Sequence, residues 1–301
     1  MITPFADDDA VDHSRLGREA RFLKECGVDG LVVGGSTGEG AGMGEEELGA
    51  AIRTVIDSVE GSLPVLGGVI ADTSEEAVRL GMAARKAGAA GLQVPPPHFY
   101  FSTDPRILST YYRDITDATG LPLIIYNVIP WAQLAVESLR EITSKNRLIV
   151  GIKQSGRNIH ALLHLLANLK GQVKIYSAID DMIFPSFALG VDGTISGTSS
   201  LFPRETVAIR DAVREGNFAT ALNLHERILP VWRFVDRPDF PSRIKCVMAL
   251  TGRHPGRPRR PFDWPDSGEI ARIRRILEDQ GFLSHKAGTS LDFELMPLGS
   301  H

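Results

Sequence analysis

The sequence has few cysteines, a small net charge and no long apolar run. It contains two cysteines, Cys26 and Cys246, far apart in the chain, so we expect no disulfide framework and a cytoplasmic setting. The net charge of −4 offers no basic face, so neither nucleic acid nor an anionic membrane is expected as a partner. No apolar run approaches the roughly 20 residues that span a bilayer, and no secretory signal opens the chain.

The chain instead contains short apolar runs that alternate with segments of helical periodicity. The runs are rich in β-branched residues and bounded by Gly, Pro or Asn, as buried parallel strands are; they lie at 30–33, 65–68, 91–94, 123–126, 148–152, 173–176 and 193–196. Helix-length amphipathic segments separate them, at 14–26, 45–59, 74–87, 104–119, 158–169 and 204–215.

Eight βα units follow if a short first strand at 2–4 is added to the seven clear ones. Eight units without a break into halves favour a closed barrel over a doubly wound sheet. We therefore predict an α/β protein, a (β/α)8 TIM barrel over 1–216. Helices at 217–235, 242–250 and 268–280 predict a C-terminal helical extension over 217–284, and 285–301 is set aside as a disordered tail or an added sequence.

Active sites of such barrels lie at the carboxyl ends of the strands, so the reactive residues there matter most. Lys153 follows the run 148–152, and Tyr126 ends the run 123–126. An ammonium group is costly to desolvate, so a buried lysine is available as the neutral amine that attacks a carbonyl. A strand-end lysine that merely extends to solvent, and a tyrosine that merely fills the core, are the alternatives.

Other strand ends carry groups that could hold a substrate. The segment 34–39, GGSTGE, offers backbone amides and the hydroxyls of Ser36 and Thr37, which suit a carboxylate or phosphate, but it fits neither a Walker loop nor a dinucleotide fingerprint. Asp180 and Asp181 follow another strand, where helix capping or binding of a substrate hydroxyl is favoured over a metal. We predict no metal and no cofactor.

Taken in order, these motifs resemble the family of dihydrodipicolinate synthase and N-acetylneuraminate lyase. The matching segments lie on successive strand ends and are GSTGE at 35–39, YNV at 126–128, GIKQS at 151–155 and GTIS at 193–196. The resemblance extends from Thr3 to about Gly281, nearly the whole chain. It implies a Schiff-base lyase without metal or organic cofactor, acting on a small-molecule 2-oxo acid, and a homo-oligomer, either a tetramer or a dimer.

The resemblance also implies roles. Lys153 would form an imine with a 2-oxo acid, Tyr126 would shuttle a proton with help from the Ser36 hydroxyl, and Thr37 with Gly35 would hold the carboxylate. The further substrate-binding candidates are Ser155, Asp180, Ser196, Trp131 and His98.

Departures from the family pattern bear on the substrate. Dihydrodipicolinate synthases carry an arginine shortly after the tyrosine, whereas residues 126–133 here read YNVIPWAQ. The Tyr-Tyr pair of relatives is replaced by the segment 94–100, so His98 or Tyr100 would substitute, and Phe99 and Trp131 suggest a bulkier substrate tail.

Four functions therefore stay open. The first is an aldolase that forms or releases pyruvate; the second is a 2-keto-3-deoxy acid dehydratase that uses the same imine. Dihydrodipicolinate synthase is the third, disfavoured by the missing arginine. A barrel that binds a 2-oxo acid without catalysis is the fourth, and the presence of both Lys153 and Tyr126 argues against it.

Overall fold

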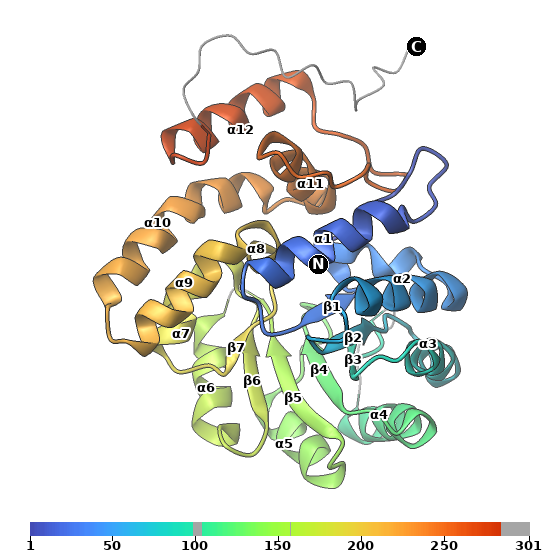
Figure 1. Ribbon diagram of the computed structural model, residues 1–301. Helices are drawn as coiled ribbons and strands as arrows, with labels where there is room; N and C mark the ends of the chain where they lie inside the picture. Colours follow the sequence, from blue (N-terminus) through green and yellow to red (C-terminus); the bar gives the residue numbers. More distant parts are fainter. Residues whose placement is uncertain (99–103, 157, 284–301) are drawn as a thin grey trace.

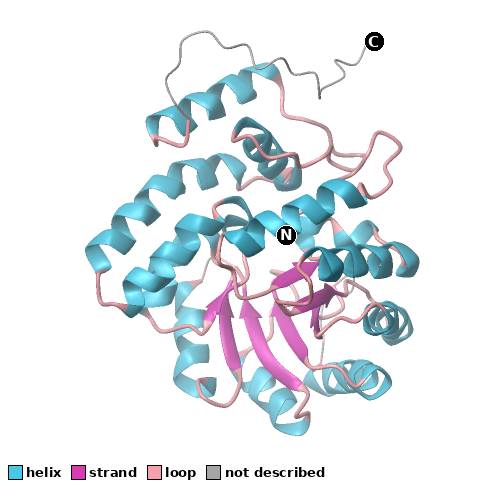
Figure 2. Ribbon diagram, viewed as in Figure 1, coloured by secondary structure: helices cyan, strands magenta, loops and turns pink. Residues whose placement is uncertain are grey.

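A computed structural model describes residues 1–98, 104–156 and 158–283 of the chain. Its centre is one sheet of seven parallel strands that lie side by side in chain order. The strands are β1 (Leu31–Val33), β2 (Val65–Gly68), β3 (Gly91–Val94), β4 (Leu123–Asn127), β5 (Ile149–Gln154), β6 (Lys174–Ser177) and β7 (Gly193–Thr194). Each coincides with one of the predicted apolar runs, and Figure 2 shows the sheet curled inside a layer of helices.

One helix before β1 and the helices that follow the strands cover the outer face of the sheet (Figure 1). They are α1 (His13–Glu25), α2 (Glu45–Ser58), α3 (Ser74–Lys86), α4 (Pro105–Thr119), α5 (Val136–Lys145), α6 (Ile159–Leu169), α7 (Ile183–Ala188), α8 (Gly197–Leu201) and α9 (Pro203–Arg214). Several begin at a side-chain cap that accepts an amide hydrogen of the first turn, as Asp12 does for Arg15 and Asn158 does for Ala161. The six predicted segments match within two residues, whereas α5, α7 and α8 were not predicted.

The predicted first strand at 2–4 is wrong. No strand forms there within the described residues; instead the amino group of Met1 donates to the carbonyl oxygen of Val32, 3.0 Å away. Phe5 makes isolated bridges to Val11 and Arg257. Pro4 has no amide hydrogen to donate to a neighbouring strand.

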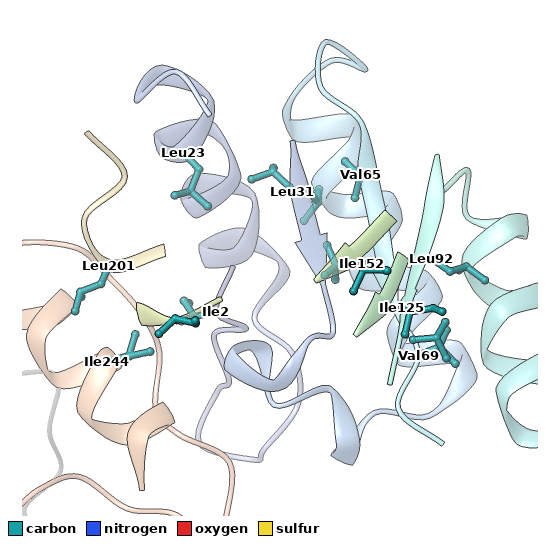
Figure 3. Packing of buried hydrophobic residues seen from close by; sticks show 14 of the residues in the cluster. Ile2, Leu23, Leu31, Val65, Val69, Leu92, Ile125, Ile152, Leu201 and Ile244 are labelled. Atoms are coloured by element: carbon teal, nitrogen blue, oxygen red, sulfur yellow. The ribbon is translucent and has the colours of Figure 1, made fainter. Parts of the chain in front are cut away.

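The N-terminal stretch nevertheless belongs to the core. Ile2 and Phe5 are fully buried, and Figure 3 shows Ile2 near Leu201 and Ile244. A cavity of about 340 Å³ remains between the two edge strands, and its lining includes Met1, Val32, Ile124, Tyr176, Thr194 and Ser196. The interior of the barrel is thus less completely filled on the side where an eighth strand would lie.

Three further helices complete the fold: α10 (Phe218–Val235), α11 (Phe240–Leu250) and α12 (Ser267–Asp279). They lie together beside the barrel (Figure 1), and α11 packs against α8 and against the turn that follows β1. No helix in the described part of the chain is both long and apolar enough to cross a membrane.

Candidate active site

Lys153 and Tyr126 occupy neighbouring positions at the carboxyl ends of β5 and β4. The strand register pairs them directly, and Nζ of Lys153 lies 3.4 Å from the centroid of the Tyr126 ring. Each side chain is only 6% exposed, so the amine does not extend into bulk water. The sequence prediction that these two residues meet inside the barrel mouth agrees with this geometry. A desolvated amine against an aromatic face can attack a carbonyl, and a phenol at this position can exchange protons with it.

The GGSTGE segment forms a tight turn directly after β1. Ser36–Gly38 is a short 3-10 helix, closed by hydrogen bonds from Gly38 and Gly40 to the carbonyl oxygen of Gly35. The first amides of such a turn have no acceptor within the helix, so those of Ser36 and Thr37 are suited to a carboxylate. Both side chains are half-buried.

Glycine is required at Gly40 of this turn for a steric reason. A Cβ atom there would lie 1.7 Å from the carbonyl oxygen of Gly34, so no other residue fits without moving the backbone. At the end of the neighbouring strand β2, a Cβ on Gly68 would lie 2.4 Å from the same oxygen. The sequence therefore folds the turn down over the end of β2, close to the barrel interior.

Ser155 and Asn127 join the ends of three strands. The amide of Ser155 donates to the carbonyl oxygen of Asn127 over 3.0 Å, and its hydroxyl donates to Ala178 over 3.4 Å. The side chain of Asn127 accepts from the amide of Leu134 and donates both to the carbonyl of Leu134 and to Gln154. These bonds hold the loop after Tyr126 against the end of β5, and Ser155 therefore contributes to the frame of the rim.

Asp180 lies beyond the end of β6 and faces the first turn of α8. Its Oδ1 accepts from the amide of Thr198 over 2.7 Å, and burial raises its pKa to about 6, against the opposing effects of Thr198, Lys153 and Ser196. The hydroxyl of Ser196 caps α8 by accepting from the amide of Ser199. The structure thus places Asp180 and Ser196 near one another and within the electrostatic reach of Lys153.

His98 and Trp131 lie together at the outer part of the rim. The indole nitrogen of Trp131 donates to the carbonyl oxygen of His98 over 2.7 Å, although 58% of Trp131 is exposed. The amide of His98 donates to Asp72 over 2.6 Å. Phe99 and Tyr100, which the sequence also suggested, lie outside the described residues. The pair can contact the far end of a long substrate, whereas neither is bonded to Lys153 or Tyr126.

Two features of this region were missed from the sequence. Gln93 in β3 is 2% exposed; its Oε1 has no hydrogen-bond partner, and its Nε2 would lie 3.5 Å from a Cβ on Gly35. A glutamine in an apolar run gives little signal, but its inward position follows from strand alternation. The second feature is an ion pair of Glu39 with Lys245, which are 206 residues apart. No local pattern connects such distant residues.

The described residues contain no group of three or more His, Cys, Asp or Glu side chains that could hold a metal ion.

Comparison with known proteins decides the family. The sequence model of the Dihydrodipicolinate synthetase family matches residues 1–280. The chain belongs to this family. It is 33% identical over 283 residues to a 4-hydroxy-tetrahydrodipicolinate synthase of Caldicellulosiruptor bescii, covering 93% of this chain and 95% of that one. A synthase of the same name from Caldicellulosiruptor saccharolyticus is 34% identical with the same coverage.

Solved structures agree with the family's fold. A crystal structure of YagE, a prophage protein of the dihydrodipicolinic acid synthase family from E. coli K12 in complex with pyruvate, superimposes with a TM-score of 0.89. It is 27% identical and covers 94% of this chain and 97% of that one. N-acetylneuraminate lyase from Fusobacterium nucleatum, 24% identical with a TM-score of 0.83, shares the fold.

These findings confirm the predicted family and the barrel architecture, with the correction to the first strand. They also confirm the class of enzyme. The Dihydrodipicolinate synthetase family consists of Schiff-base lyases of the class I aldolase type, and this chain is one of them.

Proposed function

We propose that this protein forms or cleaves a carbon–carbon bond of a longer 2-oxo acid, with pyruvate held as an imine on Lys153. The observation that carries the proposal is the buried amine of Lys153 lying 3.4 Å from the centre of the Tyr126 ring. The crystal structure of YagE, a family member in complex with pyruvate, supports the choice of ligand.

In the cleavage direction the amine of Lys153 adds to the 2-oxo carbon, and water leaves as the imine forms. The protonated imine withdraws electrons, so the C3–C4 bond breaks with its electron pair moving toward the imine nitrogen as an enamine. Tyr126 accepts the proton of the C4 hydroxyl as that carbon becomes a carbonyl, and the Ser36 hydroxyl relays it. Protonation of the enamine at C3 and addition of water then release pyruvate and free Lys153.

The remaining candidate residues bind the substrate or hold the strand ends around it. The amides of Ser36 and Thr37, with Gly35 between β1 and the turn, hold the carboxylate of the 2-oxo acid. Asp180, after β6, and Ser196, after β7, face the substrate from the other end of the sheet. His98 and Trp131 contact the far end of the substrate. Ser155 keeps the strand ends in register.

A second candidate function is that of 4-hydroxy-tetrahydrodipicolinate synthase, because curated relatives that share about a third of the residues carry this name. The segment after Tyr126 argues against it, since residues 126–133 contain no arginine where those synthases carry one shortly after the tyrosine. Dehydration of a 2-keto-3-deoxy acid uses the same imine and differs only in the bond that breaks.

The test is reductive trapping. Borohydride added with pyruvate should attach one reduced pyruvyl group, and peptide mapping should place it on Lys153. Lys153→Arg should abolish the adduct, whereas the exposed Lys174→Arg should not change it. A folded protein that gives no adduct would contradict the proposal. A screen of 2-oxo acids and aldehydes, with pyruvate distinguished from dehydrated products, then separates the three reactions.

We also propose that the protein works as a homo-oligomer, a tetramer or a dimer, in the cytoplasm. Ile107 and Trp131 are large apolar side chains that are 62% and 58% exposed, and contact with a second copy of the chain would cover them. Both cysteines are free and buried, which supports a reducing compartment. Light scattering at several protein concentrations would measure the oligomeric state.

A further inference from the structure

Glu39, the last residue of the GGSTGE turn, has a backbone conformation that needs outside support. Its φ of 57° lies in the left-handed region, which a residue with a side chain adopts only when its surroundings hold it there. Its amide donates to the carbonyl oxygen of Ser36 over 3.1 Å and so closes the turn. The conformation of Glu39 therefore determines how the amides of Ser36 and Thr37 are presented.

The support comes from the C-terminal third of the chain. Nζ of Lys245, in α11, lies 2.6 Å from Oε1 of Glu39, and the amide of Arg259 donates to Oε2 over 2.9 Å. Lys245 also donates to the carbonyl oxygen of Arg257 over 2.8 Å, and its Nζ lies 4.6 Å from the centre of the Phe5 ring. Both oxygens of the carboxylate are thus bound by residues that follow the barrel.

Both side chains of this ion pair are buried. The side chain of Lys245 is 0% exposed and that of Glu39 is 7% exposed. Burial lowers the pKa of Lys245 to about 8, while Glu39 opposes this shift and Arg259 adds to it, so Lys245 keeps its positive charge at neutral pH. Removing Lys245 would leave a buried carboxylate without its cation, which a protein relieves by moving the charge to water.

We propose that Lys245 is a positioning residue for the carboxylate-binding turn. It acts through Glu39: the ion pair fixes the left-handed backbone, and the backbone fixes the amides of Ser36 and Thr37. The inference rests on the proposed function, because those amides bind the carboxylate of the 2-oxo acid. The C-terminal helices would then set the affinity for substrate, although Lys245 itself never touches it.

The experiment measures how much pyruvate half-saturates borohydride trapping at Lys153. Lys245→Met should raise this concentration at least about tenfold, because the turn loses its support, while saturating pyruvate still traps the protein. Glu39→Gln should act in the same direction, and the double variant should be no worse than the poorer single one. Lys245→Arg, which keeps the cation, should recover most of the affinity.

The matched control is Arg243→Met, two residues earlier in α11. Arg243 is also buried and paired, with Asp239 and Glu269, but it does not contact Glu39. The concentration of pyruvate that half-saturates trapping should stay within about twofold of the parent value, since the partners of Arg243 lie at the start of α11 and in α12 and not in the turn. A folded Lys245→Met variant with the affinity of the parent would overturn the proposal.

A second measurement does not depend on pyruvate. Hydrogen exchange of the peptide that contains residues 36–42 should accelerate at least about tenfold in Lys245→Met relative to Arg243→Met, because the amides of Gly38, Glu39 and Gly40 lose their fixed acceptors. Unchanged exchange would count against the positioning role. If the parent protein traps no pyruvate but the exchange accelerates, the proposed function fails while the support of the turn by Lys245 stands. If Lys245→Met does not fold, Glu39→Gln and Lys245→Arg carry both measurements.

Discussion

Tyr126 and Lys153 are direct partners in the parallel register of β4 and β5, so their side chains leave the sheet at the same height and on the same face. The amine lies over the ring of the tyrosine, 3.4 Å from its centroid. The phenol and the amine are therefore close enough to act on one bound molecule, and substitution can separate the two proposed roles.

Tyr126→Phe keeps the ring beneath the amine and removes only the hydroxyl. Trapping of pyruvate at Lys153 should persist, whereas turnover of a full substrate should fall by about 10²-fold or more, the usual effect of losing a proton relay. Tyr176→Phe is the matched control, because Tyr176 is the partner of Lys153 on the other neighbouring strand, β6. Equal losses in both variants would argue that Tyr126 has no special role.

Asp180 should make stability depend on pH. Its pKa is raised to about 6 in the folded protein from an ordinary value of 3.8. Asp180 therefore contributes most to the free energy of unfolding below pH 3.8, and this contribution is lost as pH rises through 6. Asp180→Asn removes this loss. Relative to the parent, the variant should gain on the order of 2 kcal/mol in free energy of unfolding between pH 4 and pH 8. Urea unfolding at both pH values measures it; a constant difference would contradict the shift.

Gly40→Ala should disrupt the carboxylate-binding turn after β1. Because the added methyl group would collide with the carbonyl of Gly34, we expect a loss of about 2 kcal/mol or more in stability together with weaker trapping of pyruvate. Gly44→Ala is the control, since nothing lies within 4 Å of a Cβ at that position. Thermal unfolding of both variants gives the comparison, and equal melting temperatures would show that the turn tolerates the methyl group.

Asn127→Ala should loosen the loop after Tyr126. Three hydrogen bonds of the buried amide are lost and their partners are left unsatisfied, which costs about 2–3 kcal/mol. Asn168 is only half-buried and its side chain donates to the carbonyl oxygen of His164 in α6, so Asn168→Ala provides the control. Chemical denaturation should separate the two variants clearly, and a similar stability for both would mean that the loop is held by other contacts.

Trp131→Ala tests whether the exposed indole contacts substrate. The half-saturating concentration of pyruvate should not change, whereas that of a longer 2-oxo acid should rise by about tenfold, since a small ligand does not reach the outer rim. If both substrates respond alike, Trp131 merely packs against His98.

Sequence reasoning placed the strands well because each buried parallel strand is a compact apolar run, such as 123–127. It also brought Lys153 and Tyr126 to one rim, since parallel strands point their carboxyl ends the same way. Three helices were missed. Two of these, α7 and α8, are only 6 and 5 residues long, too short to show a period, and α5 has Ala135 at its N-cap position, which offers no side-chain cap.

The prediction of a first strand at 2–4 was wrong for a different reason. Ile2 and Phe5 have the apolar character of a strand and are fully buried, but burial there comes from packing beside the C-terminal helices and not from pairing in the sheet. Likewise, the contacts of Glu39 depend on the return of the chain after 206 residues, which no local pattern encodes.

The dependence of Glu39 on Lys245 has a consequence for protein engineering. A chimera that grafts the last third of a different family member onto this barrel would exchange Lys245 and the segment around Arg259 together. Unless the donor supplies a cation and an amide at the same two places, the hybrid would keep Lys153 but would bind the carboxylate of a 2-oxo acid more weakly.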